Sequence, residues 1–300
     1  MQNDARNVLA LEWGLRDAVV ERIHAGISSD ACVVTAGEKR YVLRKLASAQ
    51  QGHLEYQIAG ALSEQDVTPG IICTSAGKAF AEDSGSFWQL QKFAGGSKPQ
   101  NCDEELVRAV AGATAQMHKA LAAIHNDVFT PDRFALSHLL RGCDWEFLQQ
   151  SISRFGGRFE EFERLCNSLI PLDEEKQQWI HGDLGTWNLL FENGRVRIID
   201  FGECRRGSIY FDLAAAITSL LANVKDQQTC AKYVCQFQRS YAEHGTALDR
   251  EILFRYVQLW YIRGILVNAA AENCRTENSE NMIAYFWEQK NRFMELERMM

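Results

Sequence analysis

The change of hydrophobic periodicity near residue 95 constrains the fold of this chain more than any other sequence feature. Before it, short apolar runs bounded by polar residues predict β-strands at 32–35, 41–44, 71–74 and 87–93. After it, apolar residues recur every three or four positions, which predicts helices. The segment 94–99, AGGSKP, separates the two patterns and is rich in residues that end regular structure. The sequence therefore predicts an α+β fold of two lobes, a sheet lobe over 1–94 and a larger helical lobe over 95–300.

Helices are expected in both lobes. In the first lobe, Leu54, Ile58 and Leu62 recur every four residues and predict a helix from about 47 to 63. In the second lobe, Asn101 or Asp103 can cap a helix whose apolar face extends to Leu121. Further helices are expected at 133–155, 157–170, 208–223, 226–244, 249–273 and 279–298.

Composition excludes several classes of protein. The net charge of −7 argues against a nucleic-acid partner, because duplex binders usually carry an excess of basic residues. No apolar run approaches the ~20 residues that a bilayer requires, and the N-terminus lacks the pattern of a signal peptide. The nine cysteines are scattered without Cys-x-x-Cys pairs, as expected for buried thiols in a reducing compartment. We therefore expect a cytoplasmic protein that does not associate with membranes.

The segment 179–202 interrupts the helical pattern of the second lobe. Asn-Gly at 193–194, between two apolar runs, is a strong hairpin signal, because both residues tolerate the positive φ of a type I′ turn. A two-residue turn there pairs Glu192 with Arg195 and, counting back, Asn188 with Ile199. Asn188 and the next residue, Asp200, then lie at the same open end of the hairpin. Strict alternation along the strands would put them on opposite faces, so we expect the ladder to fray at this end.

A third polar residue, Asp183, comes five positions before Asn188 in a loop that contains glycine. Two carboxylates and a carboxamide therefore gather at the mouth of the hairpin. Such hard oxygen ligands suit Mg²⁺, which usually takes one or two carboxylates together with substrate phosphates. A carboxylate that is not a ligand can orient a hydroxyl and accept its proton. The pattern favours phosphoryl transfer, and the alternative is an ordinary turn region with surface acids.

This segment resembles the catalytic core of the aminoglycoside phosphotransferase and choline kinase family, small-molecule kinases with a protein-kinase-like fold. The resemblance is carried by His-Gly-Asp at 181–183, the asparagine at 188, Asp-Phe-Gly at 200–202 and Asp-Leu-Ala at 212–214. It implies that Asp183 is the catalytic base and that Asn188 and Asp200 bind Mg²⁺. His181 and Asp212 would support the catalytic loop. ATP would donate the phosphoryl group, with GTP left open.

The resemblance also places the nucleotide in the first lobe. The loop over the phosphates would lie at 26–30, where backbone N–H groups and the residues Gly26, Ser28 and Ser29 could bind phosphate oxygens. This loop has one glycine only, and the alternative is a polar turn. Near the end of the strand at 41–44, a cation should pair with the phosphates. Arg44 shares a face with Val42 and is favoured over Lys45.

Five further residues are candidates for the nucleotide or acceptor site. Glu55 is the acid that would hold the phosphate-binding cation. Gln91 and Phe93 precede the boundary and are placed to present backbone groups to the adenine edge, although Phe93 could instead pack in the core. Glu203 directly follows Asp-Phe-Gly and could line the acceptor pocket. Arg263 lies in an apolar helix, where a buried guanidinium needs either a substrate anion or an ion pair.

These observations predict an ATP- and Mg²⁺-dependent phosphotransferase whose acceptor is a hydroxyl of a small molecule, such as a sugar, amino sugar, amino alcohol or aminoglycoside. We expect a monomer or a homodimer. One alternative is a protein kinase of the same fold, which the absence of an Ala-Pro-Glu sequence after Asp-Phe-Gly disfavours. The other is a nucleotide-binding module without catalysis, which would not need the residues at 183, 188 and 200.

Overall fold

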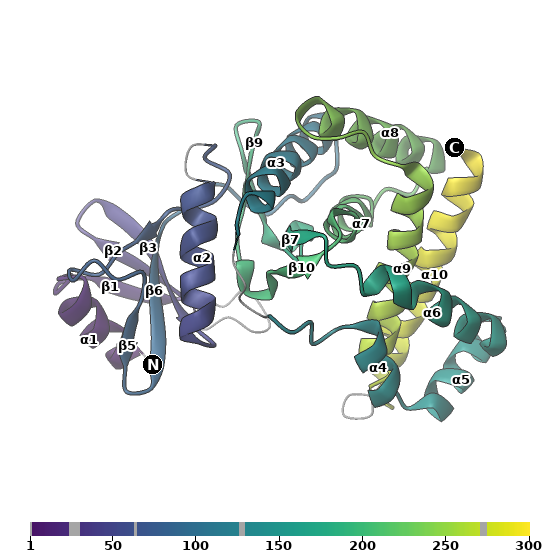
Figure 1. Ribbon diagram of the computed structural model, residues 1–300, viewed down its shortest axis with the longest axis horizontal. Helices are drawn as coiled ribbons and strands as arrows, with labels where there is room; N and C mark the ends of the chain where they lie inside the picture. Colours follow the sequence, from purple (N-terminus) through teal and green to yellow (C-terminus); the bar gives the residue numbers. More distant parts are fainter. Residues whose placement is uncertain (1, 24–30, 63–64, 126–129, 271–274) are drawn as a thin grey trace.

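The computed structural model describes residues 2–23, 31–62, 65–125, 130–270 and 275–300. It has an α+β fold in which an antiparallel sheet with two helices precedes a larger, mostly helical part (Figure 1). This architecture confirms the fold class and the order of the two lobes that the sequence predicted.

The first lobe is built on one antiparallel sheet with the strand order β1-β2-β3-β6-β4, in which β5 also pairs with β6. Its elements are α1 (Gln2–Glu12), β1 (Val19–Arg22), β2 (Ala31–Ala36), β3 (Lys39–Leu46), α2 (Ala49–Ala61), β4 (Ile71–Ile72), β5 (Ala81–Asp83) and β6 (Ser86–Lys92). Helix α1 covers the outer face of the sheet, and α2 lies between the sheet and the second lobe (Figure 1).

Side-chain alternation along β3 decides which residues reach the space between the lobes. Leu43 is fully buried and packs with Val8 and Leu9 of α1 on the outer face. Its neighbour Arg44 points to the opposite face, toward α2, because successive side chains of a strand alternate. Helix α2 then joins the lobes, since its apolar face, including Ile58, belongs to the core of the helical lobe.

The second lobe surrounds the short segment 178–207, which holds the candidate catalytic residues, with helices. Its helices are α3 (Glu104–Ala122), α4 (Leu136–Gly142), α5 (Trp145–Arg154), α6 (Phe159–Asp173), α7 (Ile209–Leu220), α8 (Gln227–His244), α9 (Arg250–Asn268) and α10 (Glu277–Met299). Two small antiparallel pairs lie among them, β7 (Gln178–Ile180) with β10 (Arg205–Gly207) and β8 (Leu189–Glu192) with β9 (Arg195–Ile198). Two short 3₁₀ helices, η1 (Thr186–Asn188) and η2 (Phe201–Glu203), complete the segment.

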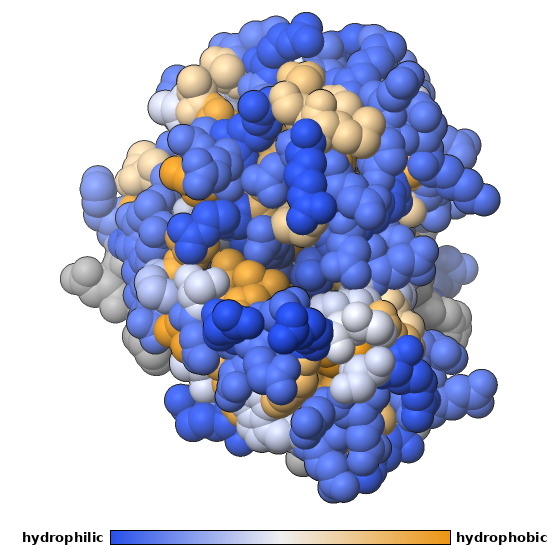
Figure 2. Space-filling model, turned by 90° about the vertical axis from the view of Figure 1, so that its right-hand side faces the viewer, coloured by the Kyte–Doolittle hydropathy of each residue, from blue (hydrophilic) through white to orange (hydrophobic). Residues whose placement is uncertain are grey.

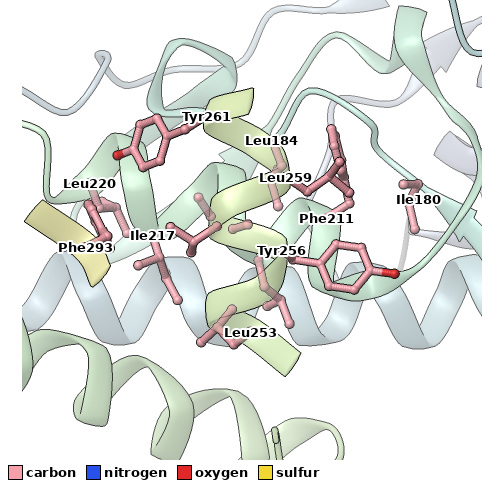
Figure 3. Close-up of a cluster of buried hydrophobic side chains, with 14 of the residues drawn as sticks. Ile180, Leu184, Phe211, Ile217, Leu220, Leu253, Tyr256, Leu259, Tyr261 and Phe293 are labelled. Atoms are coloured by element: carbon pink, nitrogen blue, oxygen red, sulfur yellow. The ribbon is translucent and has the colours of Figure 1, made fainter. Parts of the chain in front are cut away.

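Helices α7 and α9 form the centre of this lobe (Figure 3). Ile217 and Leu259 are buried there, and Phe211 extends the cluster toward Leu184 of the catalytic segment. The loop that bears the candidate catalytic residues is therefore anchored in the main core. Such anchoring limits the motion of the loop and fixes the direction of its polar side chains.

Several elements differ from the sequence prediction. The helix expected at 133–155 is two helices, because Asp144 caps α5 by accepting a hydrogen bond from the backbone N–H of Phe147 (3.0 Å). Helix α9 ends at Asn268 rather than 273. The sequence analysis missed helix α1. It also missed the strands β1, β5, β7 and β10, because strands of three or four residues are too short to give a periodic signal.

Within the described ranges, no helix is both long and apolar enough to cross a membrane. None of the eight cysteines in these ranges forms a disulfide.

Candidate active site

The hairpin of β8 and β9 has the register that the sequence predicted. Glu192 pairs with Arg195, and the two turn residues between them have positive φ angles, 50° at Asn193 and 74° at Gly194. At the open end, the backbone N–H of Ile199 donates to the carbonyl oxygen of Asn188 (3.0 Å). Asn188 and Asp200 therefore lie just beyond the paired residues at the open end of the hairpin, where the regular strands have ended.

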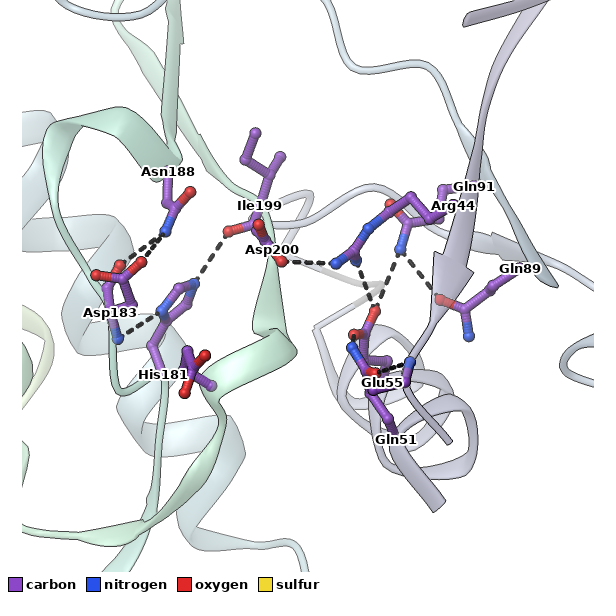
Figure 4. A network of polar contacts seen from close by, with 12 residues as sticks. Arg44, Gln51, Glu55, Gln89, Gln91, His181, Asp183, Asn188, Ile199 and Asp200 are labelled. Carbon is purple, nitrogen blue, oxygen red and sulfur yellow. Dashed lines mark hydrogen bonds and ion pairs between the residues drawn. The ribbon is translucent and has the colours of Figure 1, made fainter. Parts of the chain in front are cut away.

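Asp183 and Asn188 are held together by direct hydrogen bonds (Figure 4). The side-chain amide of Asn188 donates to the backbone oxygen of Asp183 (2.8 Å) and to its carboxylate Oδ2 (3.0 Å). The indole N–H of Trp187 donates to the same Oδ2 (3.1 Å). Burial raises the pKa of Asp183 and nearby Asp200 adds to this effect, while the hydrogen bonds from Trp187 and Asn188 oppose it.

His181 connects the catalytic loop to the strand that precedes Asp200. The backbone N–H of Asp183 donates to Nδ1 of His181 (3.2 Å), and Nε2 lies 3.0 Å from the carbonyl oxygen of Ile199. From this geometry we assign the proton to Nε2, so the imidazole is neutral and donates to Ile199. The fully buried ring also packs on Phe201, with centroids 4.7 Å apart.

Asp212 anchors the backbone of the catalytic loop from the first turns of α7. Its fully buried carboxylate accepts hydrogen bonds from the backbone N–H groups of His181 (2.7 Å) and Gly182 (2.8 Å) and contacts Nε2 of His118 (3.1 Å). Burial alone would raise the pKa of Asp212, but His118 and the backbone hydrogen bond from Gly182 outweigh it, so the pKa lies below its usual value. The loop is thus fixed by an ionised carboxylate.

Asp200 faces the first lobe across the cleft. Its backbone has the left-handed conformation, with a φ of 64°, and its carboxylate Oδ1 lies 2.6 Å from a guanidinium nitrogen of Arg44. Another nitrogen of Arg44 donates to the carboxylate of Glu55 (2.8 Å). Burial would lower the pKa of Arg44, yet Glu55 and Asp200 together raise it. This permanently charged guanidinium joins the two lobes at the candidate site (Figure 4).

Glu55 is itself held by a network on α2 and β6. Only 3% of its side chain is exposed, and it accepts hydrogen bonds from the side-chain amides of Gln51 (2.7 Å) and Gln91 (3.5 Å) as well as from Arg44. Lys45, the alternative cation, also borders the cavity between the lobes, but it follows Arg44 on the other face of β3 and its ammonium nitrogen lies 6.0 Å from the ring centroid of Trp88. The geometry therefore favours Arg44 as the cation on the cleft side of β3.

A cavity of about 550 Å³ opens beside these groups and is lined from both lobes. Arg44 and Gln51 line it from the first lobe, and Asp183 and Asp200 from the second. The second lobe also contributes apolar side chains to the wall, namely Phe134, Phe211, Trp260, Val267, Met282 and Phe286. Charged residues lie among them, since Arg133 and Arg263 line the cavity over the rings of Phe134 and Phe211.

The two candidate acceptor residues line this cavity but are paired within the protein. Glu203 forms an ion pair with Arg133 at the cavity wall. Arg263 pairs with Asp173 and with Asp132 (2.5 Å), and its guanidinium lies 4.5 Å from the centroid of the Phe211 ring. For Arg263, the structure thus shows the buried ion pair that the sequence left open as an alternative to a substrate anion.

Comparison with known proteins identifies the family. The sequence pattern of the phosphotransferase enzyme family matches residues 19–248, well over half of the chain. The chain belongs to the phosphotransferase enzyme family. Its membership confirms the resemblance noted from the motifs and identifies the protein as a phosphotransferase. No curated protein sequence is similar enough to count as a match.

Solved structures share the fold of this phosphotransferase over nearly its whole length. An amicoumacin kinase in complex with AMP-PNP and Ca²⁺ has a TM-score of 0.75 at 14% identity, covering 97% of this chain and 93% of the kinase. A microcompartment-associated aminopropanol kinase has a TM-score of 0.71 at 14% identity, with coverages of 99% and 98%. A spectinomycin phosphotransferase in complex with ADP and spectinomycin has a TM-score of 0.68 at 16% identity, covering 98% of each chain.

Some predicted residues of the phosphotransferase lie outside this constellation. Gly26, Ser28 and Ser29 fall outside the described residues. Gln91 reaches the Glu55 network through its side chain. The Phe93 ring lies under the guanidinium of Arg40, whose carbon is 3.8 Å from the ring centroid, and Phe93 is not among the residues that line the cavity.

Other functional residues of this phosphotransferase were missed by sequence reasoning. Arg205 is buried, donates to the backbone oxygen of Gly182 (3.0 Å) and pairs with Asp132 (2.9 Å), so it supports the catalytic loop from β10. Gln51 contacts Glu55, and His118 contacts Asp212. Gln51 lies one helical turn before Glu55, and this spacing was a signal that could have found it. His118 and Asp212 lie 94 residues apart, so no local pattern points to their contact.

Proposed function

We propose that this phosphotransferase moves the γ-phosphoryl group of ATP to a hydroxyl of a small molecule in a Mg²⁺-dependent reaction. The observation that carries the proposal is that Asp183, which is hydrogen-bonded to Asn188, and Asp200, which pairs with Arg44, line one cavity between the lobes. A family member with this constellation has the groups that phosphoryl transfer needs, and little covalent chemistry is required of the protein.

The donor set fits a hard divalent cation. Asn188 uses its amide N–H groups on Asp183, and within the described ranges no donor contacts its carbonyl oxygen, which leaves that oxygen free to act as a ligand. Asp200 is 38% exposed and gives one carboxylate oxygen to Arg44. Asn188 and Asp200 would therefore hold Mg²⁺. When bound, Mg²⁺ would offset the negative charge of the nucleotide phosphates.

Arg44 is our candidate for the cation that contacts the nucleotide phosphates. The ion pair with Glu55 fixes the position of the Arg44 guanidinium. A guanidinium offers several hydrogen-bond donors in a rigid plane, which suits phosphate oxygens. When the nucleotide binds, Arg44 would give up part of its contact with Asp200 and would bind the phosphate oxygens instead. The solved neighbours with AMP-PNP and ADP support a nucleotide in this cleft, with ATP as the donor and GTP left open.

Asp183 would act on the acceptor rather than on the nucleotide. Its carboxylate lines the cavity, and the hydrogen bonds from Trp187 and Asn188 fix its orientation. A carboxylate held in this way can accept a hydrogen bond from the acceptor hydroxyl and take its proton as the new O–P bond forms. The geometry of the loop would come from His181 and Asp212, which bind its backbone.

We place the acceptor next to the aromatic side chains that line the cavity. The kinases with a similar fold are named for amicoumacin, aminopropanol and spectinomycin, which span antibiotics and amino alcohols. Because Glu203 is neutralised by Arg133, the cavity lacks the excess of acidic groups that a polycationic aminoglycoside would favour. We therefore favour a sugar, amino sugar or amino alcohol, and no finding supports a protein substrate or a module without catalysis.

The proposal is tested by measuring Mg²⁺-dependent ATP consumption across a library of hydroxyl compounds. We expect at least one compound to accelerate ATP consumption and to be recovered as its phosphate ester. The Asp183→Asn variant should lower kcat by two orders of magnitude or more while ATP still binds, since a carboxamide cannot take the proton. Near-normal kcat in this variant would show that Asp183 is not the base.

A further inference from the structure

Trp187 of η1 is a large apolar side chain that stays 41% exposed beside the catalytic loop. The surface at the helical end of the molecule is mostly hydrophilic, with apolar side chains in small groups between polar ones (Figure 2). Exposure of a single apolar residue says little about function by itself. The indole of Trp187, however, makes three defined contacts, with Asp183, Gly185 and Trp260.

The carboxylate of Asp183 is held through one of its two oxygens. The indole N–H of Trp187 (3.1 Å) and the side-chain amide of Asn188 (3.0 Å) both donate to Oδ2. A carboxylate oxygen has two lone pairs, so these two donors occupy Oδ2. None of the residues that the structure describes donates to the other oxygen, Oδ1. This arrangement leaves Oδ1 as the oxygen that can receive a proton from the acceptor.

The two donors to Oδ2 differ in what else they do. The side-chain amide of Asn188 also donates to the backbone oxygen of Asp183 (2.8 Å), and its carbonyl oxygen is our candidate Mg²⁺ ligand. An indole has a single N–H and no acceptor, so Trp187 can give that N–H to one partner only. Trp187 is therefore the donor that serves the carboxylate of Asp183 alone.

Gly185 and Trp260 set the position of the indole. A Cβ at residue 185 would lie 2.2 Å from Cζ2 of Trp187, so the ring packs directly on the glycine backbone. The φ of Gly185 is −92°, which any residue adopts, so a side chain at 185 is excluded by this close approach and not by the backbone. The indole also stacks with Trp260, with centroids 6.3 Å and planes 20° apart, and Trp260 lines the cavity. Trp187 thus connects the cavity wall to Asp183.

We propose that Trp187 is a positioning residue that holds Asp183 so that Oδ1 takes the proton of the acceptor hydroxyl. This inference rests on the proposed function, in which Asp183 is the base. In the step, the hydroxyl proton passes to Oδ1 and the hydroxyl oxygen forms a bond to the γ-phosphorus of ATP. The bond from that phosphorus to the bridging oxygen breaks, and ADP leaves. Without the indole N–H, the carboxylate can rotate, which slows this step and leaves nucleotide binding intact.

The kinetic test uses the full-length protein with Mg²⁺ and ATP. The acceptor is the fastest compound of the library described above, or water if no compound reacts. Trp187→Phe keeps an aromatic ring and removes the N–H donor, so kcat should fall about tenfold or more while KM for ATP stays within about twofold. The control, Trp145→Phe, alters another exposed tryptophan that does not line the cavity, and it should leave kcat unchanged.

Gly185→Ala perturbs the same contact from the other side. It keeps the indole N–H but displaces the ring, so kcat should again fall about tenfold or more. Phenylalanine lacks the far part of the indole that the new Cβ would meet. In the Trp187→Phe background, Gly185→Ala should therefore change kcat by less than about twofold. Additive losses in the double variant would contradict a shared action through the indole.

The hydrogen bond itself can be measured without any acceptor, from the indole N–H resonances of the isotope-labelled protein. The chain has seven tryptophans, and the resonance that disappears in Trp187→Phe belongs to Trp187. A hydrogen bond to a carboxylate deshields this proton. Asp183→Ala should therefore move the Trp187 resonance upfield by more than any other indole resonance. A Trp187 resonance that does not move would overturn the proposal.

The kinetic outcomes separate this inference from the proposed function. Near-normal kcat in Trp187→Phe, together with a large loss in Asp183→Asn, would overturn the positioning role and leave Asp183 as the base. Near-normal kcat in both variants would overturn the positioning role together with the proposed base. A loss of kcat in both, with KM for ATP preserved in Trp187→Phe, is the result that we expect.

Discussion

The replacement Asp212→Asn tests whether one buried carboxylate supports the catalytic loop. The carboxylate is fully buried and is bound by two backbone N–H groups and by His118. A carboxamide has one acceptor atom where the carboxylate has two, so at least one buried donor loses its partner. The loss of a hydrogen bond to a charged group costs ~1.5–3 kcal/mol, and an unsatisfied buried donor adds to this. We expect the free energy of unfolding to fall by about 2–4 kcal/mol.

The effect should depend on pH in a defined direction. The pKa of Asp212 is lowered in the folded protein, so its contribution to stability is fully present above the unfolded value of ~3.9 and is lost as the pH falls through the folded pKa. The difference in unfolding free energy between the natural protein and Asp212→Asn should therefore be constant near neutral pH and shrink below about pH 4.

Urea unfolding followed by circular dichroism at several pH values measures this difference. The control is Asp103→Asn, at the N-cap of α3, where the carboxylate accepts a hydrogen bond from the backbone N–H of Leu106 (2.8 Å). Asparagine caps helices as well as aspartate does, so the control should change stability by less than about 0.5 kcal/mol. A similarly small change in Asp212→Asn, or a difference that persists undiminished in acid, would refute the reasoning.

Two further variants test the cleft. Glu55→Gln removes the buried charge that holds Arg44, so kcat/KM for ATP should fall about tenfold or more in steady-state kinetics, with little change in the circular dichroism spectrum. An unchanged kcat/KM would show that the position of Arg44 does not matter for nucleotide binding. Gly182→Ala should inactivate the enzyme and lower its thermal midpoint, because φ is 83° and a Cβ would lie 2.3 Å from the backbone oxygen of Glu203. A fully active, equally stable variant would contradict this packing.

The parts of the site that are close in sequence were predictable, and the parts that depend on packing were not. Asn-Gly at 193–194 determined the hairpin and its register, which placed Asn188 opposite Ile199. Strand alternation likewise directed Arg44 to the cleft. In contrast, the pairing of Arg263 with Asp132 and Asp173 joins segments 90 residues or more apart, and no local pattern reveals such a pairing.

The same distinction applies to the fold. Long helices with a regular apolar face, such as α8, were predicted within one or two residues of their bounds. Strands of three residues, such as β7 and β10, form because they pair with each other and pack against the core. The sequence near them has too few residues to show a period of two, so their position follows from tertiary structure.

The most direct test of the central claim is a titration of Mn²⁺ with AMP-PNP followed by electron paramagnetic resonance, because the claim is that Asn188 and Asp200 hold one divalent ion on the nucleotide. The natural protein should bind the Mn²⁺–nucleotide complex, and Asp200→Ala should bind it at least about tenfold more weakly. Asp183→Asn, which alters the proposed base, should retain most of the affinity. Equal affinity in the natural protein and Asp200→Ala would contradict the account.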